Sequence, residues 1–181
     1  MSKTDHTRED FIEAFWRLYA DAPVEKITVS ALTDVAGYNR GTFYLHFKDI
    51  YDLFDQAKQN LLDQMAECVE FCSANMGKIQ LIELMMRLLS LYERNRTPLV
   101  LLLGDRGDPA FTRQLKDLMK TMPLWRVADP SIDVPDGERD LMLEQTVAGV
   151  LYLIEAWLED SRGVSATRLL HLIYDTSIKR G

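Results

Sequence analysis

The chain has 181 residues, 47% of them hydrophobic and 27% charged, and a formal net charge of −7 at pH 7. This length can bury a sizeable core, and the composition excludes a disordered or low-complexity chain. The polar N-terminus precedes no signal-peptide-like apolar stretch, and no later run approaches the roughly 20 apolar residues of a membrane span. We therefore expect a cytoplasmic protein with no membrane partner.

The first predicted helix begins at a cap made by Thr7 and its reciprocal acid Asp10, and it ends at Pro23. Apolar residues recur along it at intervals of three and four, the period of one helical face. These residues are Phe11, Phe15, Leu18 and Ala22. One side of this helix is therefore expected to pack on a core.

Two short helices follow, separated by a turn. Thr28 begins the first of them, and Gly37 supplies the left-handed conformation that ends it. Asn39 is a good N-cap for the second, in which Phe43 and Phe47 face inward. This arrangement turns the neighbouring polar side chains toward the sides and solvent: Arg40, Thr42, Tyr44 and His46.

This order of elements is the helix-turn-helix plan, in which the second helix enters the major groove of DNA. Many helical corners share the plan, so the spacing alone is weak support for DNA binding. Residues 1–50 carry six Lys and Arg against eight Asp and Glu, a balance of −2. Between Gly37 and Lys48, however, there is no acidic residue, which leaves a locally positive face on an acidic protein.

Asp49 can cap a long fourth helix with an apolar stripe, interrupted at Gly77. Further helices are predicted over 81–91, over 98–103 and from the Asp108-Pro109 cap onward. Strand signals are absent from the sequence. The proline-rich stretch 123–137 is predicted to be a loop.

The last two predicted helices, 138–159 and about 165–179, are too apolar for a single buried stripe. They either form a subunit interface as a four-helix bundle with their symmetry mates, or they are core helices within one subunit. Periodicity does not choose between these alternatives. The candidate dimer-interface residues are Val147, Leu151, Ile154, Leu169 and Ile173.

The sequence offers no constellation for catalysis, a metal or a cofactor. Cys68 and Cys72 lie four apart in a helical pattern and are interpreted as core thiols, with a redox sensor as the alternative. The three histidines are scattered, so no metal site is predicted. Without a nucleophile with its base or a glycine-rich phosphate loop, we expect no enzyme activity and no cofactor.

The stretch ITVSALTDVAGYNRGTFYLHFKD, residues 27–49, resembles the DNA-binding segment of the TetR family of bacterial transcriptional regulators. The matching features are the Thr28 cap, Ala36-Gly37, the run from Thr42 to Tyr44, His46-Phe47 and Lys48-Asp49. The resemblance covers residues 7–55 well. It implies an all-α protein with a three-helix helix-turn-helix DNA-binding domain over 1–50 and a helical ligand-binding and dimerisation domain over 51–181.

The resemblance also implies roles for single residues. Phosphate contacts would come from Thr28, Tyr44, His46 and Lys48, and base contacts from Arg40 and Thr42. Gly41 would allow a close approach to the groove. Ile50 stands where many members carry a phosphate-contacting lysine, which puts affinity in doubt. Taken singly, Tyr44 could instead cover the core, His46 could be an ordinary surface histidine, and Arg40 could pair with Asp34.

The function implied by the resemblance is a homodimeric regulator, usually a repressor, of a palindromic operator, controlled by a small-molecule or protein effector. Candidate pocket residues, which could equally be plain core, are Phe71, Met85, Met86, Tyr92, Met119 and Trp125. The alternative function is a regulator-like adaptor or co-activator that acts through a protein partner. Ile50 and the negative balance of residues 1–50 favour that alternative slightly.

Overall fold

The computed structural model describes residues 3–74, 78–104, 107–122 and 135–178. In these ranges every regular element is helical, which confirms the all-α class. The chain folds into two compact units, residues 1–61 and 62–181, each described separately below. The division falls inside the fourth helix rather than at residue 50, because the first turns of that helix supply core residues to the first unit.

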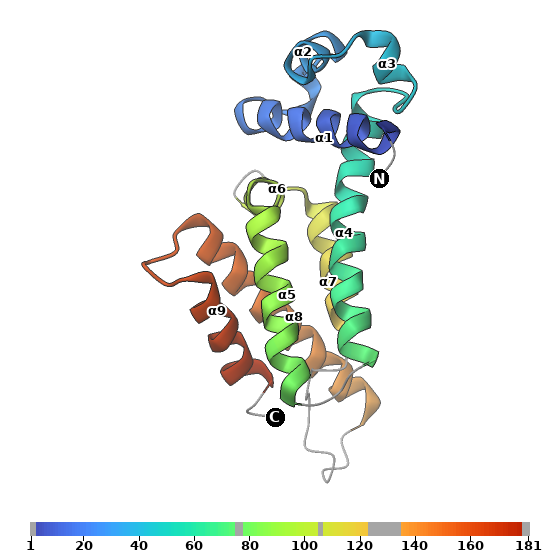
Figure 1. The fold of residues 1–181 in the computed structure, drawn as a ribbon. Helices are drawn as coiled ribbons and strands as arrows, with labels where there is room; N and C mark the ends of the chain where they lie inside the picture. Colours follow the sequence, from blue (N-terminus) through green and yellow to red (C-terminus); the bar gives the residue numbers. More distant parts are fainter. Residues whose placement is uncertain (1–2, 75–77, 105–106, 123–134, 179–181) are drawn as a thin grey trace. The chain divides into compact units, whose positions relative to one another are not determined.

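The first unit contains α1 (Lys3–Asp21), a short 3-10 turn (Val24–Lys26), α2 (Val29–Ala36), α3 (Arg40–Tyr44) and the beginning of α4 (Ile50–Ala74) (Figure 1). The cap predicted at Thr7 is wrong, since α1 already begins at Lys3. Two nitrogens of the Arg8 guanidinium, Nη2 and Nε, donate to Gln56 Oε1 at 3.0 and 3.2 Å. These hydrogen bonds connect the N-terminal part of α1 to α4.

Aromatic side chains form the core of the first unit. Phe11 is fully buried and meets the rings of Phe43 and Phe47 edge-on, at centroid distances of 5.6 and 6.1 Å. Phe15 stacks on Tyr19 at 5.5 Å and contacts Phe54 of α4 at 5.3 Å. Burying rings of this size is the main apolar contribution to stability, so α1, α3 and α4 are held around one centre.

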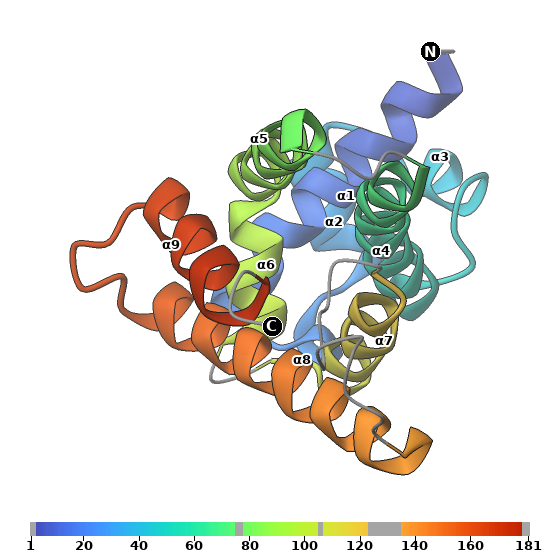
Figure 2. The ribbon, with the colours of Figure 1, turned by 90° about the horizontal axis from the view of Figure 1, so that it is seen from below.

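The second unit comprises the rest of α4, α5 (Lys78–Arg94), α6 (Arg96–Leu103), α7 (Pro109–Lys120), α8 (Asp136–Glu159), α9 (Ala166–Ile173) and a π-helical turn (Tyr174–Ile178). Helix α8 packs against α6 and α7, and α9 packs against α5 (Figure 2). The predicted Asp108 cap is confirmed, since its carboxylate accepts from the backbone N–H groups of Ala110 and Phe111.

Two boundaries differ from the sequence prediction. Asp136 and Gly137, expected to close a loop, are the first residues of α8. The rest of that predicted loop, 123–134, and the predicted break at Gly77 lie outside the described residues. The last helix is α-helical only as far as Ile173 and continues as the π-helical turn.

Helix α8 is long and rich in apolar residues. Among the described residues it alone is long and apolar enough to cross a membrane by length and composition, with a mean hydropathy of 1.3 over 18 residues. The sequence expectation missed this because it counted uninterrupted apolar residues. In this fold Glu144 of α8 forms ion pairs with Lys116 and Lys120 of α7. Packing on several neighbours accounts for part of its apolar character.

Candidate nucleic-acid interface and apolar cavity

The turn between α2 and α3 is defined by local hydrogen bonds. Thr28 Oγ1 accepts from the backbone N–H of Ala31 at 3.2 Å and caps α2. Gly37 ends α2 at φ +76°, and its N–H donates to Thr33 O at 3.0 Å. Glycine adopts this left-handed conformation without a steric cost. The glycine at position 37 therefore allows α2 to end and the chain to turn here.

Asn39 begins α3 in the way the sequence predicts. Its side-chain Oδ1 accepts from the backbone N–H of Thr42 at 2.8 Å and also lies 3.2 Å from Thr42 Oγ1. A Cβ on Gly41 would stand 3.1 Å from this same oxygen. A side chain at position 41 would therefore press on the cap, which gives Gly41 a structural reason in addition to the expected close approach to DNA.

The outer face of α3 presents polar and cationic side chains. Arg40 is exposed, and no described residue forms a hydrogen bond or ion pair with its guanidinium, so the alternative pairing with Asp34 is not found. Tyr44 is 59% exposed, and its ring only touches the edge of Phe43 at 5.3 Å. The reading of Tyr44 as a core cover is therefore wrong, since most of its side chain faces solvent.

His46 and Lys48 follow α3. His46 is half-buried, with its ring 6.3 Å from Phe11 and 6.2 Å from Phe47, so it is partly a packing residue as well as a polar one. Lys48 is exposed, and its backbone N–H donates to Asp52 Oδ2 at 2.8 Å. Thr42 is half-buried, and its hydroxyl donates a hydrogen bond to Asn39 Oδ1. Thr28 is exposed at the N-terminus of α2.

The N-terminus of α4 is capped reciprocally. Asp49 Oδ1 accepts from the backbone N–H of Asp52 at 2.9 Å, which confirms the predicted cap. The pKa of the Asp52 carboxyl is lowered, first by the Lys48 backbone N–H and then by the Gln56 amide that donates to it. Ile50, at the position where the resemblance led us to expect a lysine, is buried in the core.

Two exposed side chains near α3 were missed by the sequence analysis. Leu45 is 82% exposed and Tyr51 is 54% exposed, and both belong to the same short stretch as Tyr44 and Lys48. The available signal was that neither residue falls on the apolar stripe formed by Phe43, Phe47 and Leu53. Apolar side chains can contact thymine methyl groups, so these two positions extend the candidate interface.

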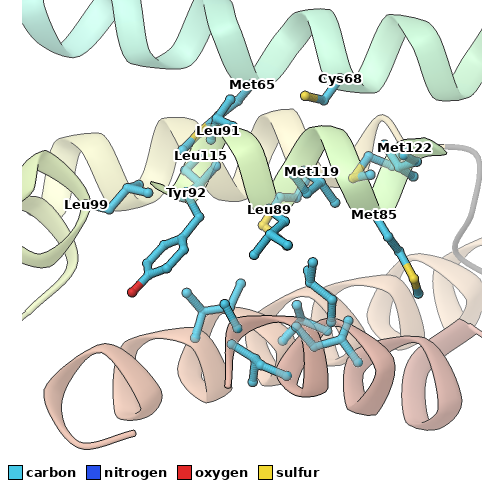
Figure 3. A pocket seen from close by; sticks show the side chains of 18 of the residues that line it. Met65, Cys68, Met85, Leu89, Leu91, Tyr92, Leu99, Leu115, Met119 and Met122 are labelled. Atoms are coloured by element: carbon cyan, nitrogen blue, oxygen red, sulfur yellow. The ribbon is translucent and has the colours of Figure 1, made fainter. Parts of the chain in front are cut away.

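A second feature, a cavity of about 200 Å³, lies inside the unit 62–181 (Figure 3). All six helices of this unit contribute to its wall, including Met65 and Cys68 of α4 and Trp157 of α8. Among the lining residues that the structure describes there is no Asp, Glu, Lys, Arg or His. Burial raises the pKa of the Cys68 thiol, which keeps it neutral.

Some of the predicted pocket residues line this cavity and others do not. Met85, Tyr92 and Met119 line it (Figure 3). Met86 is 66% exposed, because neighbouring residues on a helix point about 100° apart, so its assignment to the pocket is wrong. Phe71 packs instead beside Cys68, Leu84 and Leu91 and does not line the cavity, and Trp125 lies outside the described residues.

The predicted interface residues lie inside the single chain. Val147 and Leu151 are buried, Leu169 and Ile173 pack with Val150 of α8, and Ile154 lines the cavity. They pack within the single chain, as the alternative of core helices describes, and their assignment to a subunit interface stays a prediction. Other apolar residues of α8 and α9 are exposed: Leu141, Met142, Tyr152 and Leu172.

No group of three or more His, Cys, Asp and Glu side chains in the described part of the chain could hold a metal ion.

Two features of the described chain are candidates for function. The first is the cationic, acid-free surface of α3 in the first unit, and the second is the cavity in the second unit, whose described lining residues are uncharged.

Comparison with known proteins agrees with this geometry. Residues 11–57 match the family model described as bacterial regulatory proteins, tetR family. The matched segment begins in α1 and ends in the first turns of α4, so it contains the whole helix-turn-helix. No curated protein matches the sequence significantly.

Several solved structures share the fold. A TetR transcriptional regulator from Streptococcus agalactiae 2603V is 18% identical, with a TM-score of 0.64 over 94% of this chain and 95% of its own. SmeT, the repressor of the Stenotrophomonas maltophilia multidrug efflux pump SmeDEF, is 18% identical, with a TM-score of 0.66 over 99% and 94%. DhaS, a dihydroxyacetone kinase operon activator, is 19% identical, with a TM-score of 0.61 over 93% and 92%.

Proposed function

We propose that this chain, a member of the TetR family of bacterial transcriptional regulators, represses transcription by binding a palindromic operator as a homodimer and releases it when an effector occupies the cavity. The observation that carries the DNA-binding part is the face of α3, where Arg40 is exposed and pairs with no acidic side chain among the described residues. A carboxylate on that face would oppose phosphate, and none occurs between Gly37 and Lys48.

The roles of the single residues follow from chemistry and exposure. Tyr44 and Lys48 point a hydroxyl and an ammonium at solvent and suit phosphate oxygens, as does the exposed Thr28 at the N-terminus of α2. His46 can add a phosphate contact from its half-buried position. Arg40, directly after the Asn39 cap, is at the end of α3 that enters the groove first and suits guanine O6 and N7.

Thr42 has a more limited role than Arg40. Its hydroxyl already lies within hydrogen-bonding distance of Asn39 Oδ1, so its methyl group is the part best suited to a base. A thymine methyl is the expected partner of such a group. Gly41, which must stay small to spare the cap, lets the DNA backbone come close to the start of α3.

Dimerisation is proposed through exposed residues rather than the buried ones. Leu141 and Tyr152 are 69% and 73% exposed, and both lie on α8. Together with Leu172 of α9 they leave apolar surface uncovered in the single chain. A symmetric interface needs such a self-complementary apolar surface, and a helix-turn-helix dimer needs two linked copies to hold both half-sites.

Effector control is proposed through α4. This helix is continuous from Ile50, in the core of the first unit, to Ala74, and its residues Met65 and Cys68 line the cavity. A ligand that binds one position of α4 better than another changes the population of that position. Because the same helix reaches the DNA-binding unit, this change can alter the presentation of α3.

Repression is the mode we propose, and activation is its alternative. SmeT and DhaS share this fold at similar identity, and they are a repressor and an activator, respectively. An adaptor that acts through a protein partner is a second candidate function. The observation that favours it is Leu45, an apolar side chain that is 82% exposed beside Tyr44.

Capture of genomic DNA tests the proposal. The purified full-length chain is mixed with sheared genomic DNA at physiological salt, and bound fragments are sequenced. We expect a small set of fragments located upstream of genes, and we expect the Arg40→Glu/Lys48→Glu variant, folded by circular dichroism, to capture none of them. Fragments spread evenly over the genome would contradict operator binding. Failure to capture any DNA would leave the adaptor as the better account.

A further inference from the structure

We infer that the cavity of the second unit binds a small, uncharged, predominantly hydrocarbon molecule of about one aromatic ring, and that it discriminates against charged analogues of the same size. This inference rests on the proposed effector control and names the chemical class of the effector. It concerns the cavity lined by Met65, Cys68, Leu89, Tyr92 and Met119, among other residues (Figure 3). Trp157 also lines it.

The described residues that line the cavity carry no formal charge. Carboxylate, ammonium, guanidinium and imidazole groups are all absent from its lining residues, and the raised pKa of the Cys68 thiol keeps that group protonated. A ligand with a charge would lose its hydration without gaining a partner, which costs far more than the apolar contacts return.

The charged residues on the neighbouring helix turns are engaged elsewhere. On α5, Arg87 lies 4.1 Å above the ring of Phe71 and donates to Glu83 at 3.0 Å. On α8, Glu144 is paired with Lys116 and Lys120. None of these side chains lines the cavity, so a charged ligand has no obvious counter-ion within it.

Glu155, also on α8, lines a different hollow together with Glu159. The pKa of the Glu155 carboxyl is raised, mainly by burial and to a smaller extent by the negative charge of Glu159. This carboxylate is not among the described residues that line the cavity, so a cation inside it would make no direct contact with Glu155. The charged groups of both helices thus leave the cavity to apolar contacts.

The described lining residues offer few hydrogen-bonding groups to a ligand. Trp157 Nε1 is already used, since it donates to Val164 O at 2.7 Å. Tyr92 packs its ring against Trp157 at a centroid distance of 5.1 Å, and its hydroxyl makes no hydrogen bond with a described residue. An occupant with one hydroxyl group can therefore be accommodated, whereas a strongly polar one cannot.

The volume limits the size of the occupant. An apolar cavity of about 150 Å³ holds benzene, and the cavity here measures about 200 Å³. The flexible thioether side chains of Met65, Met85, Met119 and Met122 can adjust to an irregular outline. A single substituted ring fits this space, and a fused multi-ring drug does not fit without a rearrangement.

A matched set of four probes tests the inference on the full-length chain without DNA: toluene, benzyl alcohol, benzoate and benzylammonium. All four have one ring and one small substituent, and only the first two are neutral at pH 7. At about ten times the Kd, toluene and benzyl alcohol are expected to raise Tm by about 3 °C or more. The charged pair is expected to leave Tm unchanged and to give no heat in titration calorimetry.

A cavity-filling variant locates the binding. Leu89→Phe adds bulk to a residue that lines the cavity, and it should weaken toluene binding by about tenfold or more, as loss of the available space requires. Met86→Phe makes a similar change at an exposed position of the same helix and should bind toluene like the parent. Equal weakening in both variants would place the ligand elsewhere.

The result that overturns the inference is binding of benzoate or benzylammonium as tightly as toluene, or the absence of toluene and benzyl alcohol binding. Both are decided on the unmodified chain, so they hold even if Leu89→Phe does not fold. Since no DNA is present, either result is distinct from a failure of operator binding in the genomic capture. Conversely, captured operators with no neutral ligand bound would overturn this inference alone.

Discussion

At the scale of single residues, exposure separates the side chains that face solvent from those that hold the fold. Tyr44, Leu45 and Lys48 are exposed, whereas Phe43 and Phe47 of the same stretch, 43–48, are buried. This alternation explains why the sequence identified polar candidates here: the inward rings fix the phase of α3, and the outward positions follow from it. Leu45 was missed because an apolar residue was expected to be inside.

Lys48→Ala should weaken binding to all DNA sequences alike and reduce the slope of log Kd against log salt by about one, because one phosphate contact and its released counter-ion are lost. Fluorescence anisotropy over a series of salt concentrations measures this slope. Arg113→Ala removes an exposed cation from α7 and should leave it unchanged. A Lys48 variant with the parental slope would remove Lys48 from the interface.

At the scale of elements, the caps that begin and end the short helices were predictable, because each one is local in sequence. Gly37, Asn39, Asp49 and Asp108 all act within three or four residues of themselves. The faces of α8 were not predictable, since apolar residues surround this helix. Only the placement of its neighbouring helices determines that Val147 is buried and Tyr152 is not.

Gly37→Ala should lower the free energy of unfolding by about 1–2 kcal/mol, because alanine at φ +76° brings its Cβ too close to the backbone. Chemical denaturation followed by circular dichroism measures the loss. Gly137→Ala is the matched control, at the start of α8, where φ is not positive and no atom lies within 4 Å of the added Cβ. Equal losses in the two variants would contradict the left-handed turn.

The ion pairs between α7 and α8 should make stability depend on acid pH. Lys116 and Lys120 lower the pKa of the Glu144 carboxyl below its ordinary value. A carboxyl with a lowered pKa in the folded chain stabilises it above its ordinary pKa, and that contribution is lost as pH falls through the lowered one. Thermal unfolding of Glu144→Gln should therefore differ from the parent near neutral pH and converge with it at low pH. A constant difference at every pH would exclude this origin.

At the scale of the whole molecule, the sequence predicted the class of protein better than its inner surfaces. The helix-turn-helix was visible because its signals are close together in the chain. The cavity depends on six helices meeting, so it separates Met85 from Met86 only after folding. The same reason explains why the sequence did not separate the buried from the exposed residues of α8: an apolar helix has no outward face until its neighbours are placed.

The proposed dimer gives a prediction at this scale. Tyr152→Glu should yield a folded monomer with much weaker operator binding, because a charge on the exposed face opposes a second copy without disturbing the core. Leu151→Glu, one residue earlier and buried, should instead unfold the chain. Light scattering after size-exclusion chromatography distinguishes these results. A Tyr152→Glu dimer would place the interface elsewhere.

The central claim, that two linked copies of α3 read DNA with Arg40 at a base edge, is tested most directly by binding-site selection from random duplexes with the parent and with Arg40→Ala. We predict an inverted repeat for the parent. For Arg40→Ala we predict the same repeat with one relaxed position in each half-site and a cost of about 1–3 kcal/mol on the parental operator. A parent that enriches no inverted repeat, or a variant with unchanged preference at every position, would contradict the account.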